Sequence, residues 1–109
     1  MPLVRQIEVT TEALGPRAWR LSVVGELDLV TAGDLVDDLR RALRHADHVV
    51  LDLTGVDFAD STGLAALLRC RRMAGSRGAT LEVLVEPGGP VDQAARITRI
   101  SGVLGLSGE

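Results

Sequence analysis

The sequence is first informative through the residue types that it lacks. It has no lysine and no tyrosine, a single cysteine, and only two aromatic side chains, Trp19 and Phe58. Without lysine, a phosphate-binding loop ending in Gly-Lys-Ser or Gly-Lys-Thr cannot be present. The single cysteine, Cys70, can form neither an internal disulfide nor a multi-cysteine zinc site, which is typical of a reducing compartment. We therefore expect a cytoplasmic protein with no metal and no cofactor.

Positive charge and long apolar runs are also scarce. Lys plus Arg is 12 and Asp plus Glu is 15, which gives a net charge of −3 and a pI near 5.3. A nucleic-acid binder usually has a basic patch, a high pI and aromatic side chains for base stacking. No apolar run approaches the roughly 20 residues that span a bilayer, and the N-terminal residues lack a secretory pattern. We expect neither nucleic-acid binding nor direct membrane insertion.

What remains is ordinary globular composition in a chain of one-domain size, with 109 residues, 46% hydrophobic and 25% charged. Periodicity and turn residues predict strands over 3–10, 18–25, 49–53 and 79–85, a short final strand over 103–106, and helices over 32–45, from Ser61 to Gly75 or Gly78, and over 90–101. The order β-β-α-β-α-β-α predicts a small α/β domain over 1–109. Its mixed sheet carries helices packed against it, joined by right-handed crossovers.

Two polar stretches are candidates for a functional site. Asp60-Ser61-Thr62-Gly63 follows the most apolar strand and opens a helix, so we expect the Ser61 hydroxyl to be exposed near the N-cap. Gly25-Glu-Leu-Asp28 should lie at the same sheet edge, and Thr31-Ala-Gly-Asp34 resembles a capping box. The plainer alternative is that these residues only cap helices and form turns.

Catalysis is not expected at this edge. An aspartic-protease loop needs Asp-Thr-Gly or Asp-Ser-Gly, but an extra residue separates Asp60 from Gly63. A nucleophile elbow needs Gly-x-Ser-x-Gly, but residue 59 is Ala. The candidate general bases are His45 and His48, which precede the buried strand and therefore lie at its far end from Ser61. We expect a binding protein and not an enzyme.

Taken in order, these stretches resemble the STAS domain, and in particular stand-alone bacterial anti-sigma factor antagonists. The matching segments are Gly25–Asp28, Val49–Leu53, Gly55–Phe58, Asp60–Leu64, Gly78–Val85 and Ile100–Val103. Relatives usually continue with a further strand and a C-terminal helix, so the resemblance implies that residues 1–109 lack that helix. Ala59 also stands where a larger apolar residue is common.

The resemblance implies a regulatory role for the edge. Ser61 would be the phosphoacceptor of an anti-sigma factor that is itself a serine kinase with a histidine-kinase-like ATPase fold. The unphosphorylated form would bind this partner and release a sigma factor, and a serine phosphatase would reset the switch. The residues expected to bind the partner are Glu26, Asp28, Asp60, Thr62 and Gly63.

Two other functions remain open at this point. A STAS domain can also be a docking subunit of a membrane transport or lipid-trafficking ATPase complex, in which Ser61 needs no phosphorylation. A small enzyme with Ser61 as nucleophile lacks a nearby base. The oligomeric state is not determined by the sequence.

Overall fold

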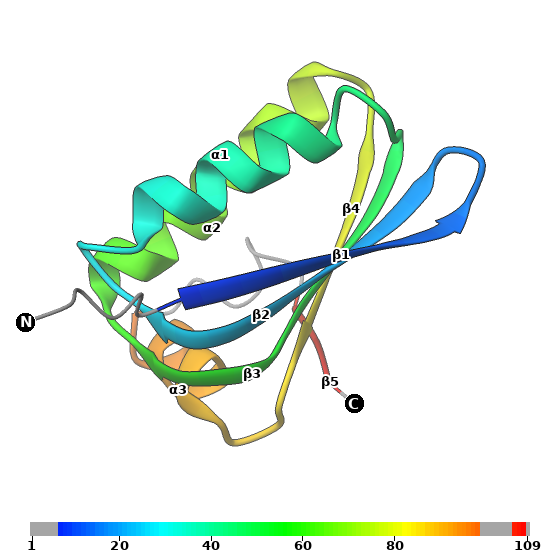
Figure 1. Ribbon diagram of the computed structural model, residues 1–109. Helices are drawn as coiled ribbons and strands as arrows, with labels where there is room; N and C mark the ends of the chain where they lie inside the picture. The colour runs from blue at the N-terminus through cyan, green and yellow to red at the C-terminus, as the bar shows by residue number, and fades with distance from the viewer. Residues whose placement is uncertain (1–6, 99–105, 109) are drawn as a thin grey trace, which may run out of the picture.

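Alternating strand and helix patterns in the sequence produce one mixed β-sheet with helices on one side (Figure 1). The computed structural model describes residues 7–98 and 106–108. The elements are β1 (Ile7–Gly15), β2 (Ala18–Leu27), α1 (Ala32–Ala42), β3 (His48–Ala59), α2 (Ser61–Ser76), β4 (Thr80–Val85), α3 (Pro90–Ile97) and β5 (Leu106–Gly108).

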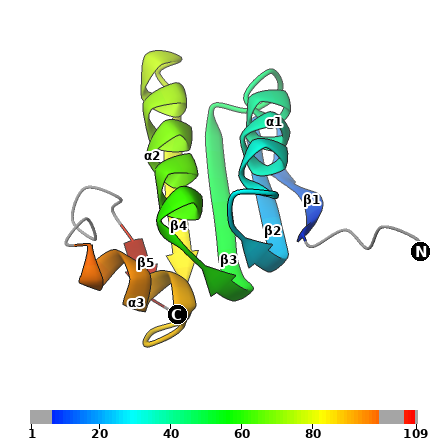
Figure 2. The ribbon, with the colours of Figure 1, turned by 90° about the vertical axis from the view of Figure 1, so that its left-hand side faces the viewer.

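The sheet has the strand order β1-β2-β3-β4-β5. The hairpin of β1 and β2 is antiparallel, and each later strand is parallel to its neighbour, which is the geometry that helical crossovers require. Figure 2 shows α1 and α2 side by side in front of the sheet, with α3 below them. The predicted fold class, a small mixed sheet with helices packed against it, is confirmed.

The core lies between the sheet and this helix layer. Side chains alternate along the strands, so that Leu21 and Val23 of β2 and Leu51 and Leu53 of β3 are buried against the helices. The helices contribute apolar residues at helical spacing, namely Leu35, Val36 and Leu39 of α1, Leu64, Leu67 and Cys70 of α2, and Val91 and Ala95 of α3. The helices therefore have one fixed orientation on the sheet, which fixes where their N-termini lie.

Strand β3 is much longer than the predicted strand over 49–53. It continues to Ala59 because it stays paired with β2, with Gly25 opposite Val56, and Leu27 opposite Ala59. Two irregularities in this pairing behave as β-bulges, and Gly25 has a φ of 115°, a conformation that favours glycine. As a result, β2 and β3 end together at one edge of the sheet.

Other predicted boundaries need smaller corrections. The first strand continues to Gly15 and does not end at residue 10, because it stays paired with β2, and residues 3–6 of the prediction lie outside the described residues. Helix α1 ends at Ala42 and not at residue 45. The predicted α2 is confirmed, with its end at Ser76. Helix α3 is described over Pro90–Ile97, and residues 99–101 of its predicted range lie outside the described residues. The last strand covers Leu106–Gly108, and residues 103–105 of its prediction likewise lie outside them. Of the described helices, none combines the length and the apolarity that crossing a membrane requires.

Candidate functional site

Asp28 holds the loop between β2 and α1. Its Oδ1 atom accepts hydrogen bonds from the backbone N–H groups of Val30 (2.9 Å) and Thr31 (3.1 Å). The Thr31 hydroxyl donates to the Glu26 carbonyl oxygen at 2.7 Å and accepts from the Asp28 N–H at 3.0 Å. It caps no helical N–H, so the predicted capping box of Thr31 and Asp34 is wrong. The cause is that Thr31 already has helical backbone angles and its hydroxyl is engaged in the loop.

Asp60 caps α2 and joins the two strand ends. Its backbone is extended, and its Oδ1 atom accepts a hydrogen bond from the Gly63 N–H at 2.9 Å. The Asp60 N–H donates to the Leu27 carbonyl oxygen at 3.2 Å, which ties the end of β3 to the end of β2. A Cβ atom at Gly63 would collide with that same carbonyl oxygen, so only glycine lets the first turn of α2 pack this closely on β2. The expectation that the two polar stretches share one edge is confirmed, and we call residues 26–31 and 57–63 the Ser61 edge.

Ser61 is the first residue of α2, and its side chain is exposed. Because Asp60 provides the cap, the Ser61 hydroxyl has no hydrogen-bond partner in the described part of the chain. Thr62 is half-buried. Of these two hydroxyl groups, that of Ser61 is therefore the more accessible to a partner, and it lies close to the partial positive charge of the helix N-terminus.

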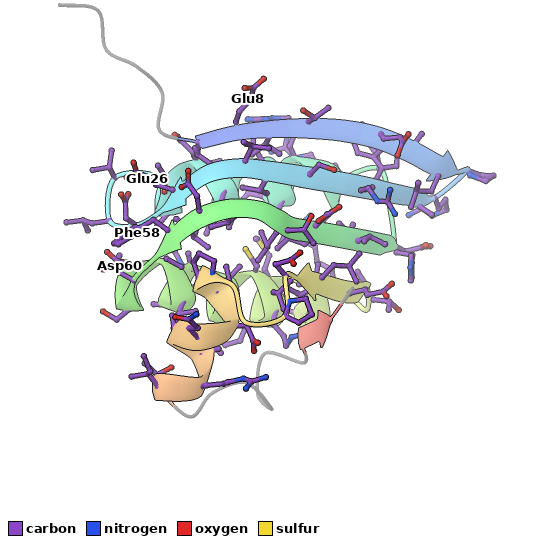
Figure 3. All side chains as sticks on the ribbon, turned by 90° about the horizontal axis from the view of Figure 1, so that it is seen from below. Glu8, Glu26, Phe58 and Asp60 are labelled. Carbon is purple, nitrogen blue, oxygen red and sulfur yellow. The ribbon has the colours of Figure 1, made fainter. Side chains whose placement is uncertain are left out.

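Apolar side chains at the Ser61 edge were not predicted. Leu29 and Val30, in the Asp28 turn, are 75% and 74% exposed, and Phe58, near the end of β3, is 48% exposed. Figure 3 shows Phe58 beside Glu26, its partner in the pairing of β2 and β3. The sequence signal for this surface was the apolar pair Leu29-Val30, which stands in a turn directly before a helix. Exposed apolar side chains gathered at one edge are typical of a protein-binding surface.

The residues that we expected to bind a partner differ in their exposure and in the hydrogen bonds that they already make. Glu26 and Thr62 are half-buried at the edge, and Gly63 is buried beneath it. Asp28 and Asp60 each direct one carboxylate oxygen to backbone N–H groups, so they shape the edge as well as making it negative. Their role in binding a partner stays a prediction.

The two histidines lie at the other end of the sheet. The ring of His45 stacks on Trp19, with centroids 5.2 Å apart and an interplanar angle of 13°. His48 is the first residue of β3, and residue 57, where the Ser61 edge begins, follows nine residues later, about 30 Å along the strand at ~3.3 Å per residue. Within residues 7–98 and 106–108, no three His, Cys, Asp or Glu side chains gather as a metal site. The Ser61 edge thus presents a hydroxyl without a neighbouring histidine.

Comparison with known proteins places the chain in a family. A family model described as "Mlab, STAS domain" matches residues 10–107. The chain belongs to the STAS domain family. No curated protein sequence matches it.

Solved STAS structures share its fold. It is similar to an anti-sigma factor antagonist from Mycobacterium paratuberculosis, with 25% identity and a TM-score of 0.78, covering 92% of this chain and 84% of that one. Unphosphorylated SpoIIAA, an anti-sigma factor antagonist, has 17% identity and a TM-score of 0.69, with coverage of 94% and 88%. The phosphorylated form of the Bacillus cell fate determinant SpoIIAA has 15% identity and the same TM-score of 0.69, with coverage of 94% and 91%. At these lower identities the two SpoIIAA structures support the fold alone.

Proposed function

We propose that this STAS protein is an anti-sigma factor antagonist that binds its partner through the Ser61 edge, and that phosphorylation of Ser61 abolishes the binding. The observation that carries this proposal is the exposed, unpartnered Ser61 hydroxyl on a hydrogen-bonded frame. The 25% identity to an anti-sigma factor antagonist supports the partner class. The protein acts by binding and is not itself an enzyme.

The phosphoryl transfer needs a kinase partner. An anti-sigma factor with a histidine-kinase-like ATPase fold would bring ATP to the edge, and the Ser61 Oγ atom would attack the γ-phosphorus. The bond from that phosphorus to the β,γ-bridging oxygen breaks, ADP leaves, and the hydroxyl proton passes to a base on the kinase, since both histidines of this chain lie far away. A serine phosphatase would restore the hydroxyl by hydrolysis: water attacks the phosphorus, the bond to the Ser61 Oγ atom breaks, and inorganic phosphate leaves. ATP and sigma factors are cytoplasmic, so we infer the same location for this protein.

The switch acts on the interface and leaves the fold intact. A phosphoserine carries about −1.5 to −2 charge, which changes the net charge from −3 to roughly −5. At the first residue of a helix this charge is locally favourable by about 0.3–1 kcal/mol. A partner that covers Leu29 and Val30, however, would have to desolvate a dianion beside the Asp28 and Asp60 carboxylates. Binding is therefore lost while stability is kept.

Affinity capture from the native host tests the proposal. The baits are the wild type, Ser61→Ala, Ser61→Glu and, as a control with the same charge change on the same helix, Ser76→Glu, since Ser76 is exposed at the other end of α2. We expect wild type, Ser61→Ala and Ser76→Glu to retain an ATPase-fold kinase that Ser61→Glu loses. With γ-labelled ATP, the captured kinase should label the wild type and Ser76→Glu but not Ser61→Ala.

The same experiment distinguishes the alternative function. A docking subunit of a membrane transport or lipid-trafficking ATPase complex would use the edge without phosphorylation. If all four baits retain the same transporter subunits, Ser61 has no switching role and the docking function replaces the proposal.

A further inference from the structure

Helix α2 carries three arginines and no acidic residue. On exposed helices, arginines commonly pair with Asp or Glu three or four residues away, and α2 offers no such partner. Arg71 donates to the Leu81 carbonyl oxygen at 3.2 Å, but Arg69 and Arg72 are exposed and have no partner in the described part of the chain. Both precede the last turn of α2, which holds no basic residue, so the dipole at the end of the helix does not account for them.

Helix α1 adds charge to the same layer. Arg40 and Arg41, in its last turn, pair with Asp37 and Asp38 at 2.8 and 2.7 Å and also complement the helix dipole. Arg44 follows the helix, is exposed, and has no partner among residues 7–98 and 106–108. Asp37 and the three arginines line an open hollow of about 240 Å³.

The two sets of arginines belong to neighbouring helices of one layer. Figure 2 shows α1 and α2 side by side, and Cys70 of α2 is fully buried at their contact with the core. Burial raises the pKa of the Cys70 thiol to about 12, while the charges of Arg69 and Arg40 act in the opposite direction. An arginine of each helix thus contributes to the electrostatics of one buried thiol. We call Arg40, Arg41, Arg44, Arg69 and Arg72 the arginine face.

We propose that the arginine face binds an acidic protein segment through its carboxylates, independently of the Ser61 edge. The planar guanidinium fork matches a carboxylate in bidentate geometry, and three of the five arginines are free for it. Arg69 lies eight residues after Ser61, which is about 12 Å along the helix, so the two surfaces can be occupied at the same time.

Other polyanions fit the face less well. Among the described residues, the exposed large apolar side chains are Leu14, Val24, Leu29, Val30, Phe58 and Ile97. None of these belongs to α2 or to the arginine-bearing end of α1, so the described part of the face offers no large apolar side chain for insertion into a bilayer. Neither of the two aromatic side chains lies on it for base stacking, because Trp19 is in β2 and Phe58 in β3. The net charge of −3 also opposes an extended polyanion, whereas a short acidic segment can contact the face alone.

Backbone ¹H–¹⁵N NMR on the full chain tests the proposal with a capped dodecaglutamate peptide in 20 mM salt. Separate arms use vesicles containing 30% anionic phosphatidylglycerol and a 20-base-pair DNA duplex. The test variant is Arg69→Gln/Arg72→Gln, which removes two exposed charges. The control, Arg17→Gln/Arg96→Gln, removes two charges that pair with Asp47 and Asp92 elsewhere. Thermal melts establish that both variants fold.

We expect peptide-induced shifts over residues 40–44 and along α2, and about tenfold weaker binding in the test variant against less than twofold in the control. Ser61→Ala should bind the peptide as the wild type does, so this result stands or falls separately from the partner switch. Equal losses in both double variants, or no localised shifts, would overturn the proposal. Tighter binding to the vesicles or to the duplex than to the peptide would overturn it as well, since the face would then serve a lipid surface or a nucleic acid.

Discussion

Replacing Gly63 by alanine is the sharpest test of the frame that holds the Ser61 edge. The added Cβ atom would meet the carbonyl oxygen of Leu27, a backbone atom that is itself fixed by the hydrogen bond from Asp60. The collision cannot be relieved by rotating a side chain. Either the first turn of α2 or the end of β2 must move, and the hydrogen bond from the Gly63 N–H to Asp60 is strained in the process.

The expected cost combines three effects. Overpacking a tight contact costs about 1–3 kcal/mol, and a weakened N-cap costs about 0.5–2 kcal/mol. The better helix propensity of alanine returns up to about 1 kcal/mol. The free energy of unfolding should therefore fall by about 2 kcal/mol, which corresponds to a Tm lower by about 10 °C for a domain of this size.

Urea unfolding followed by far-ultraviolet circular dichroism measures this change, with Gly75→Ala as the matched control. Gly75 is in the same helix, and a Cβ atom there has nothing within 4 Å. Gly75→Ala should raise stability by about 0.5 kcal/mol. If Gly63→Ala unfolds within 0.5 kcal/mol of the wild type, the close contact between α2 and β2 is not as described, and the geometry of the Ser61 edge is refuted with it.

Three further outcomes follow from local contacts. Leu29→Ser/Val30→Ser, at positions that are 75% and 74% exposed, should keep stability within about 0.5 kcal/mol. It should weaken binding to the captured kinase about tenfold in calorimetry, and unchanged affinity would remove these side chains from the interface. The Cys70 thiol, buried and with its pKa raised to about 12, should resist iodoacetamide at pH 8 until urea unfolds the protein, and rapid labelling of the native state would contradict its burial. Asp92 has its pKa lowered mainly by the hydrogen bond from the Gly88 N–H, so its contribution to stability is complete above the ordinary value of 3.8 and is lost as the pH falls through the lower folded value. Asp92→Asn should thus be less stable than the wild type at pH 7 and nearly equal to it near pH 2, and a stability gap that is the same at both pH values would argue against the linkage.

The helices could be predicted because their signals are local. Apolar spacing indicates α1 and α2, and Asp60 directly before Ser61 is an ordinary N-cap signal. Strand order also follows from the alternation of elements, since each strand pairs with its neighbour in sequence. These features were sufficient to predict that Ser61 lies at the start of α2, at the edge of the sheet where β2 and β3 end.

The details of the edge depend on partners that are distant in sequence. The continuation of β3 to Ala59 follows from bulged pairing with β2, which residues 54–59 do not indicate by themselves. Thr31 has the sequence environment of a cap, but the Glu26 carbonyl oxygen competes for its hydroxyl. Whether Leu29 and Val30 point into the core or into solvent is likewise decided by the Asp28 turn and not by their hydrophobicity.

The stack of Trp19 on His45 provides a spectroscopic consequence. Trp19 is the chain's one tryptophan, and it lies at the far end of β2 from the Ser61 edge. Its stacking partner, His45, directly follows Arg44 of the arginine face in the sequence. Its fluorescence will change when the protein unfolds and will respond to a ligand near Arg44, but docking at the Ser61 edge leaves its surroundings untouched. A label-free emission spectrum can therefore assign a ligand to one end of the molecule or the other.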